Sequence, residues 1–206
     1  MKVRTEARRE AIVDAAAELF GELGYQAASM NELARRLGGS KTTLYGYFPS
    51  KEALFSAVVR QHATSHMSEA AAELQAGVED AAGLEAALHR FGERMLFVLT
   101  NDRRALTVYR MVVGEAGRSE LGELFYAAGP TEGIAALARL FSAAMARGWL
   151  HKADPKTRAL QFLALITAEI NARVYQRDPA PLSLARIRAM VGRAVAMFLH
   201  GAAARG

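Results

Sequence analysis

The sequence contains no cysteine, which excludes disulfide bonds, thiolate metal sites and cysteine nucleophiles and fits a reducing compartment. No stretch approaches the roughly 18 uncharged apolar residues that a transmembrane helix needs. The charged start, MKVRTEARRE, is not followed by the apolar segment of a secretory signal. We therefore expect a soluble, cytoplasmic protein.

Positively charged residues are only in slight excess over negatively charged ones. The 26 lysines and arginines outnumber the 21 aspartates and glutamates, for a formal net charge of +5. Residues 1–60 hold 9 basic and 7 acidic side chains, so this excess is not concentrated there. Lys2, Arg4, Arg8 and Arg9 nevertheless form a basic start of the kind that contacts the DNA backbone or minor groove. A solvated tail is the alternative for Lys2 and Arg4.

What the sequence does contain is a pair of short predicted helices joined by a glycine turn. Residues 29–37 place apolar side chains at i, i+3, i+4 and i+7, the stripe of an amphipathic helix. Ser29 and Glu32 fit a capping box at its start. Gly38 and Gly39 end it, because glycine reaches the left-handed conformation of a sharp exit. This helix, the turn and a second short helix form a helix-turn-helix pattern.

The second short helix is predicted to begin after the cap residue Ser40 and to end before Pro49. At 100° per residue, Leu44 and Phe48 share one face, which must be directed to the protein. The opposite face carries Thr42 and Thr43. Hydroxyl and methyl groups of this kind suit base edges and phosphates in the DNA major groove.

The segment from Arg8 to Val59 resembles the DNA-binding domain of the TetR family of bacterial transcriptional regulators. The resemblance covers about 50 residues with many fixed spacings. It is carried by Ile12–Phe20, Gly24-Tyr25, Ser29-Met30, Leu33-Ala34, Leu44-Tyr45, Tyr47-Phe48 and Ser50–Phe55.

This resemblance implies a set of DNA contacts, and the chain differs from the usual family sequence at two positions. Family members usually carry an apolar residue, often valine, at the position of Gly39, and a larger residue at that of Gly46. The first change is expected to loosen the turn, and the second removes a side chain that could read a base. With the arm residue included, the expected DNA-binding residues are Arg4, Ser29, Met30, Ser40, Lys41, Thr42, Thr43, Tyr45, Tyr47 and Lys51.

The rest of the chain reads as further helices without strands, so the predicted fold is all-α. We expect residues 1–50 to form the DNA-binding domain and residues 51–206 an effector-binding and dimerisation domain. The expected helices span residues 51–74, 83–99, 102–115, 118–128, 130–147, 155–176 and 183–203. The clearest break is the segment Arg177–Pro181.

Residues 91–176 resemble, more loosely, the AefR-like C-terminal domain found on some TetR relatives. Arg110–Glu115, Phe125-Tyr126, Gly129-Pro130, Ala146–Gly148, Asp154-Pro155 and Phe162 carry this resemblance. It implies control of efflux or stress genes. Aromatic residues and methionines at helical spacing fit either a core or a concave apolar site with a few polar groups. The candidate ligand-binding residues are Met95, Tyr109, Met111, Glu115, Phe125, Tyr126, Phe162 and Glu169.

The last two long predicted helices carry broad apolar stripes. TetR-family proteins dimerise through two such helices from each subunit, so the resemblance implies a homodimer; burial of the stripes inside one subunit is the alternative. The stripes consist of Leu163, Ile166, Ile170 and Val174 on one helix and Ile187, Val191, Ala194 and Phe198 on the other.

Together these patterns predict a ligand-responsive DNA-binding regulator, most simply a repressor released from a palindromic operator by a small apolar molecule. An activator or an effector-independent DNA-binding protein on the same fold remains the alternative. His62 and His66 have the i, i+4 spacing of a zinc pair, but no acidic general base lies between them. We therefore expect no enzyme, no metal site and no cofactor.

Overall fold

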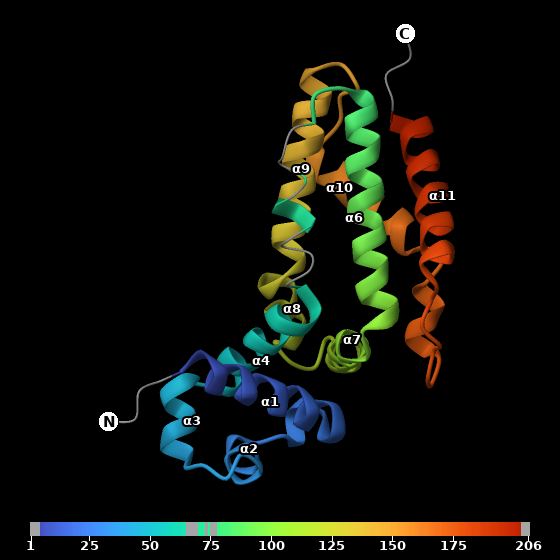
Figure 1. Ribbon diagram of the computed structural model, residues 1–206. Coiled ribbons are helices and arrows are strands. Elements are labelled where there is room, and N and C mark those ends of the chain that lie inside the picture. The colour runs from blue at the N-terminus through green and yellow to red at the C-terminus, as the bar shows by residue number, and fades with distance from the viewer. Residues whose placement is uncertain (1–4, 65–69, 73, 75–77, 203–206) are drawn as a thin grey trace. The chain divides into compact units, whose positions relative to one another are not determined.

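The computed structural model describes residues 5–64, 70–72, 74 and 78–202 (Figure 1). Over these ranges the chain is built from helices joined by short turns, without a β-strand. The all-α prediction is confirmed. The helices are α1 (Glu6–Ala27), α2 (Met30–Arg36), α3 (Lys41–Tyr47), α4 (Lys51–Val58), η1 (Val59–Thr64), α6 (Ala81–Asn101), α7 (Arg103–Glu115), α8 (Leu121–Ala128), α9 (Pro130–Ala146), α10 (Pro155–Thr167), η2 (Asn171–Tyr175) and α11 (Leu184–Ala202).

The helices group into two compact units that are not simply consecutive in sequence. One comprises residues 1–64 and 104–129, and the other residues 65–103 and 130–206. Helices α7 and α8 therefore pack with the N-terminal helices, although they follow α6 in the chain. The division into residues 1–50 and 51–206 concerns function and stays a prediction.

The core of the first unit is formed where α1, α2, α3 and α4 turn their apolar faces inward. Phe20, Tyr25 and Phe55 pack with ring centroids 5.3 to 6.0 Å apart, at the tilted and edge-on angles that aromatic rings favour. Val112 of α7 and Leu121 of α8 are buried in the same cluster. Helices α7 and α8 are thus part of the apolar core that supports α4.

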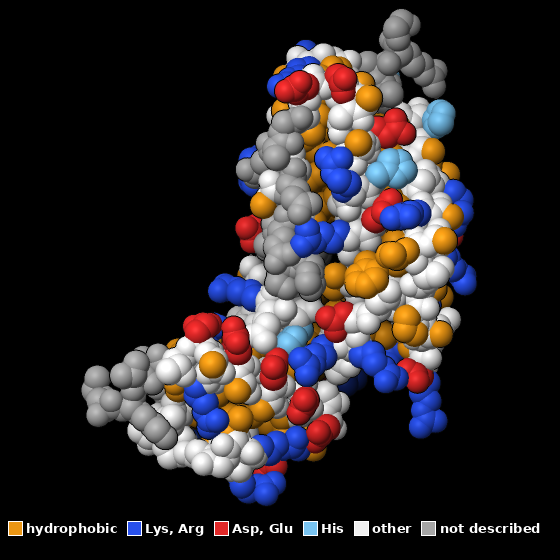
Figure 2. Space-filling model, viewed as in Figure 1, with side chains coloured by type: hydrophobic (Ala, Val, Ile, Leu, Met, Phe, Trp, Pro, Cys, Tyr) orange, Lys and Arg blue, Asp and Glu red, His pale blue; other side chains and the backbone are white. Residues whose placement is uncertain are grey.

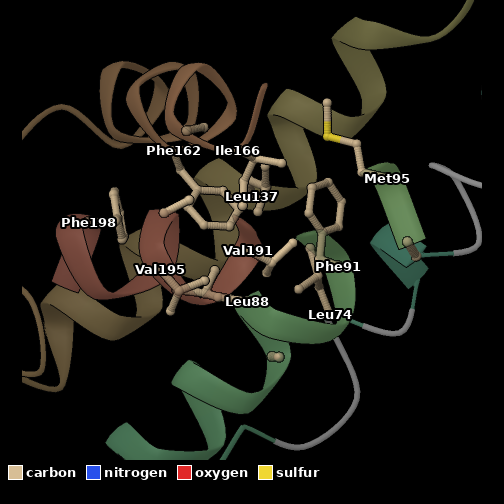
Figure 3. Packing of buried hydrophobic residues seen from close by; sticks show 14 of the residues in the cluster. Leu74, Leu88, Phe91, Met95, Leu137, Phe162, Ile166, Val191, Val195 and Phe198 are labelled. Carbon is tan, nitrogen blue, oxygen red and sulfur yellow. The ribbon is translucent and has the colours of Figure 1, made fainter. Parts of the chain in front are cut away.

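The second unit packs α6, α9, α10 and α11 around a second core, and Figure 3 shows its side chains converging from these helices. Phe162 of α10 lies at the centre, with its ring 5.2 Å from that of Phe198 and 6.0 Å from that of Phe141. All three phenylalanines are buried. Burying an aromatic side chain removes a large apolar area from water, so this cluster is a main source of the unit's stability.

A glycine allows α6 to approach α10 and α11 closely. A Cβ atom added at Gly92 would lie 2.8 Å from Cδ1 of Ile166 and 2.9 Å from Cγ1 of Val191. Both partners are buried side chains that are held by their own neighbours. The position therefore has no room for a methyl group unless these side chains shift or the helices separate.

Three expected helix ranges need correction. The helix expected over residues 155–176 ends at Thr167 as α10, and η2 follows as a separate 3-10 segment. The Thr167 hydroxyl donates to the Leu163 carbonyl, 2.9 Å away, and the Ala168 amide turns back to Leu165, which tightens and ends the helix. The helix expected at residue 118 begins at Leu121, after a turn.

The helix expected over residues 51–74 is α-helical only to Val58 and continues as the π-helical segment η1. Part of its remainder lies outside the described residues. π-Helical segments inserted in α-helices occur frequently at functional sites.

Replacing Gly92 with alanine should lower the thermal unfolding temperature, because overpacking a tight core site costs about 1 to 3 kcal/mol. Gly114 is the matched control, since a Cβ there would meet no atom within 4 Å. Gly114→Ala should leave the unfolding temperature unchanged or raise it, because alanine favours a helix by up to about 1 kcal/mol. Equal unfolding temperatures for the two variants, measured by circular dichroism, would contradict the close approach of α6.

Candidate nucleic-acid interface

Helix α3 presents the polar face that the sequence predicts. Leu44 and the C-terminal cap residue Phe48 are buried, whereas Thr42, Thr43 and Tyr45 are exposed. An amphipathic seven-residue helix anchored by two apolar side chains leaves its other face available for a ligand. The exposed groups are the hydroxyls and methyl groups of the two threonines and the ring and hydroxyl of Tyr45. Hydroxyls can bond base edges and phosphates, and methyl groups can contact the methyl group of thymine.

Ser40 fixes the start of α3. Its Oγ atom accepts a hydrogen bond from the Thr43 amide at 3.1 Å and lies 2.9 Å from the Thr43 hydroxyl. The predicted cap is confirmed, and the Thr43 hydroxyl is shared with it. Lys41 is exposed and its ammonium lies 5.7 Å from the ring centroid of Tyr45. This position leaves the charge of Lys41 accessible to a phosphate.

The turn between α2 and α3 is held by an arginine from α1. Gly38 has a φ of 60°, which explains why glycine is required there. Arg8 donates from its guanidinium to the Leu37 carbonyl at 3.1 Å, and a Cβ at Gly39 would lie 3.4 Å from the same nitrogen. The departure at Gly39 thus accompanies an arginine that packs over the turn. The sequence alone did not reveal this role of Arg8.

The start of α1 also contacts the far end of α3. The Arg9 guanidinium lies 5.2 Å from the Phe48 ring centroid. The Thr5 amide donates to the Tyr47 hydroxyl at 3.2 Å, and the Tyr47 side chain is half-buried. This hydrogen bond therefore fixes the direction of the Tyr47 side chain. Arg4, the expected DNA contact of the N-terminal arm, lies outside the described residues.

The residues expected at the start of α2 differ in their accessibility. Ser29 is exposed, and its Oγ accepts from the Glu32 amide at 3.1 Å, as predicted. The second predicted bond of the capping box, from a free backbone N–H to the Glu32 carboxylate, is wrong. The carboxylate instead accepts hydrogen bonds from Arg35 and Arg36. Met30 is buried, so only its backbone is available to lie against DNA.

Several cations of the first unit are already paired with acids. Hydrogen bonds from Arg35 and then Arg36 lower the pKa of Glu32, and the bond from Arg36 lowers that of Glu22. The Arg36–Glu22 distance is 2.6 Å. Acidic and basic side chains are accordingly interspersed over α1 on the face drawn in Figure 2. Phosphate attraction at this site depends on individual positions rather than on a uniformly basic surface.

Lys51 points inward rather than out to solvent. Its ammonium donates to the carbonyl oxygens of Tyr25 at 2.7 Å and Ala28 at 3.0 Å, and lies 4.2 Å from the Tyr25 ring centroid. Partial burial lowers the pKa of Lys51. The expected phosphate contact would compete with these bonds.

A polar cluster that sequence reasoning missed links α1, η1 and α7. The Asp14 carboxylate accepts from Gln61 at 3.0 Å and from Arg104 at 3.3 Å. The buried His62 has its Nε2 atom 3.1 Å from the same carboxylate. The i, i+4 pattern singled out His62 as a possible metal ligand, but not its contact with Asp14. His66 lies outside the described residues, among which no group of three potential metal ligands occurs.

The eight candidate ligand-binding residues fall into both units. Met95 and Phe162 are buried in the core of the second unit. Glu169 is exposed and forms two hydrogen bonds with Arg193, at 2.8 and 2.7 Å, which lower the pKa of the carboxyl. The candidates of the first unit lie on α7 and α8 and are partly or well exposed; they are Tyr109, Met111, Glu115, Phe125 and Tyr126.

Most of the expected dimer stripe is buried within a single chain, as in the alternative that the sequence left open. Leu163 and Val174 are half-buried. The remaining side chains belong to the subunit's own core and are Ile166, Ile170, Ile187, Val191, Ala194 and Phe198. Periodicity identified the apolar faces, and these six side chains pack inside the subunit, so they leave little surface for a partner. Whether Leu163 and Val174 meet a partner subunit stays a prediction.

Comparisons with known proteins agree with this geometry. Residues 12–58 match the family model for bacterial regulatory proteins of the tetR family, and residues 86–201 that for the AefR-like transcriptional repressor C-terminal domain. A TetR-family regulator from Mesorhizobium loti has a TM-score of 0.77 at 26% identity, over 98% of this chain and 100% of that one. The flavonoid-responsive regulator FrrA has a TM-score of 0.73 at 32% identity, over 98% and 100%.

Curated relatives match over shorter stretches. The transcriptional activator FasR of Mycolicibacterium smegmatis is 38% identical over 41% of this chain and 38% of its own length. The transcriptional regulator RutR of Escherichia coli K12 is 46% identical over 27% of this chain and 26% of its own. The chain thus spans less than half the length of these two curated relatives.

Helix α3 is the second helix of the helix-turn-helix, the one that enters the DNA major groove in such motifs, and we call it the reading helix. Together with the family and structural matches, it defines a helix-turn-helix transcriptional regulator, a DNA-binding protein rather than an enzyme. The chain belongs to the TetR family, with an AefR-like C-terminal domain. Among the described residues, the helices are all too short or too polar to cross a membrane.

Tyr45→Ala should weaken operator binding by about 10- to 100-fold, because a lost base or phosphate contact costs about 1 to 3 kcal/mol. Tyr126→Ala is the control, since Tyr126 is similarly exposed but lies on α8. The two variants should have the circular dichroism spectrum of the wild type. Wild-type affinity of Tyr45→Ala in a fluorescence anisotropy titration would show that α3 does not read the operator through this residue.

Proposed function

We propose that this regulator is a repressor of efflux or stress genes that leaves its operator when a small apolar molecule binds. The exposed polar face of α3, with Thr42, Thr43 and Tyr45 on a helix anchored by buried residues, is the observation that carries the DNA-binding part. The family description of the C-terminal domain as a transcriptional repressor supports the sign of regulation. The DNA-binding function is assigned to residues 1–50 and the effector and dimer functions to residues 51–206, in the bacterial cytoplasm.

The effector is proposed to be an aromatic compound bound at α7 and α8. Tyr109 and Tyr126 are about half exposed, and the Tyr109 ring lies 6.2 Å from that of Phe125 in an edge-on contact. Aromatic side chains with one polar end suit ligands that combine flat apolar surface with hydroxyl groups. The similarity to a regulator named as flavonoid-responsive supports this ligand class.

A signal from α7 and α8 has a short physical route to the DNA-binding helices. Val112 and Leu121 pack in the cluster that also contains Val58 of α4, and Arg104 binds Asp14 of α1. A ligand that favours another packing of α7 and α8 would therefore shift α4, which begins directly after the reading helix. Such coupling is limited by the ligand's difference in affinity for the two states, typically about 1 to 3 kcal/mol.

Dimerisation is proposed to use the outward faces of α10 and α11. Leu160 and Ala164 lie exposed one turn apart on α10, and Ala196 and Met197 are exposed on α11. Small and apolar side chains on two adjoining helices allow a second pair of helices to pack closely. A two-fold dimer would present two reading helices to the half-sites of a palindromic operator.

The competing proposal is activation on the same fold, and the similarity to an activator, FasR, favours it. Genomic fragment selection with the purified protein gives the operator, and in vitro transcription from that site then separates the two signs. Repression predicts less transcript when the protein is added and recovery with ligand. More transcript on addition would replace repression by activation, and no enriched site would overturn the operator-binding function.

Flavonoids and related phenolic compounds should weaken operator binding by about 5- to 150-fold, the usual range of allosteric coupling. Tyr109→Ala should keep operator affinity but lose most of this response, because its ring contributes to the proposed site. Leu23→Ala is the control, an exposed apolar residue on α1 that should respond as the wild type does. An operator affinity that no compound changes would favour effector-independent DNA binding.

Met197→Glu should convert the dimer to a monomer or weaken it at least tenfold, because a buried, unpaired carboxylate costs several kcal/mol at an interface. Leu23→Glu introduces the same charge at another exposed apolar position and should leave the dimer intact. Sedimentation velocity over a range of concentrations measures the outcome. A Met197→Glu protein that sediments as the wild-type dimer would place the interface elsewhere.

A further inference from the structure

The exit from α1 is an irregular helix end that needs outside support. Gly24 has a φ of 75°, so the regular helix is interrupted before the range ends at Ala27. The Ala28 amide reaches back to the Gly24 carbonyl at 3.2 Å. Carbonyl oxygens in the last turn of a helix have no partner within it, and at a buried end they need donors from elsewhere.

Lys51 supplies donors to this end. Its three N–H groups face three backbone carbonyls, those of Tyr25 at 2.7 Å, Ala28 at 3.0 Å and Gln26 at 3.5 Å. The ammonium also lies 4.2 Å from the Tyr25 ring centroid, within the range of a cation–π contact.

The neighbouring residue reinforces the same junction. The Tyr25 hydroxyl donates to the Glu52 carboxylate at 3.2 Å, and Tyr25 itself is buried against Phe55. The first two residues of α4 therefore both hold the end of α1. Because Ser29 caps α2 directly after Ala28, the geometry of this junction also sets where α2 begins.

We propose that Lys51 is a positioning residue, whose ammonium fixes the passage from α1 to α2 and so orients the helix-turn-helix, rather than a phosphate contact. Reaching a phosphate would require the ammonium to leave the carbonyls of Tyr25 and Ala28. Those acceptors would then lose their donor in a partly buried place, which costs free energy. Lys51 would thus influence DNA binding indirectly, by holding the helices that contact DNA in position.

Lys41 provides the matched comparison within the same unit. It is exposed, and its contact is with the exposed ring of Tyr45 at 5.7 Å rather than with backbone carbonyls. Both residues are lysines at the first position of a short helix, directly after a serine cap. Replacing each by methionine removes one charge and keeps most of the aliphatic stem.

The salt dependence of operator binding separates the two roles. Each phosphate contact contributes about 0.9 to the slope of log K against log salt concentration. Lys41→Met should lower the slope by about this amount per subunit. Lys51→Met should weaken binding by about 10- to 150-fold, the range expected for losing a hydrogen bond to a charged group, with the wild-type slope unchanged. A slope for Lys51→Met that falls as it does for Lys41→Met would overturn the proposal.

Hydrogen exchange of the free protein provides a readout that does not involve DNA. Lys51→Met should increase exchange of the amides in residues 25–30 by about tenfold, whereas Lys41→Met should leave them unchanged. Lys51→Gln keeps N–H donors without the charge and should recover part of the protection and part of the affinity. Because glutamine can also donate to a phosphate, the recovered protection of the free protein, rather than the recovered affinity, distinguishes the positioning role.

Unchanged exchange in Lys51→Met would also overturn the positioning role. Failure of the wild-type protein to select any operator would be a failure of the operator-binding function itself. The exchange experiment would in that case still decide whether Lys51 holds the end of α1.

Discussion

The reading helix depends on contacts from outside itself, because it is too short to be stable alone. Helices α2 and α3 contain seven residues each, well below the roughly 12 to 15 at which isolated helices become even marginally stable. Their geometry is therefore imposed by serine caps at their starts and by the buried side chains Leu33, Leu44 and Phe48. Arg8 and Arg9 add support from α1, Arg8 at the turn between α2 and α3 and Arg9 at the end of α3. The side chains that face DNA are therefore positioned by packing in the core and by the serine caps, rather than by interactions among themselves.

Features set by neighbouring residues were predictable from the sequence. The caps Ser29 and Ser40, the Gly38 turn and the inward direction of Leu44 follow from local chemistry and helical periodicity, and all are confirmed. Contacts between distant positions were not predictable in this way. The bonds of Lys51 to the end of α1 and of Arg8 to Leu37 span more than 20 residues, and nothing local marks those carbonyls as needing a donor.

Periodicity also could not decide what an apolar face packs against. Ile187 and Val191 would form the same apolar stripe whether they packed against a second subunit or against the core of their own subunit. Only the structure shows that both are buried in their own subunit. The end of α10 at Thr167 is a related case, since a side-chain hydroxyl competes there with a pattern that would otherwise continue the helix. The candidate effector residues were dispersed over both units for the same reason: aromatic spacing alone does not separate Phe162, a core residue, from the exposed Tyr126.

The pairing of Arg8 with Gly39 has a consequence for changing the operator of this regulator. A helix-turn-helix transplanted from a relative with valine at position 39 would add two methyl groups beyond a Cβ atom that already lies in contact with the Arg8 guanidinium, at 3.4 Å. The guanidinium would have to move to make room for them, and the graft would then lose the Arg8 bond to the Leu37 carbonyl even if every base-contacting residue were transferred. A design that changes the operator should therefore transfer positions 8 and 39 together, although they are 31 positions apart in the chain.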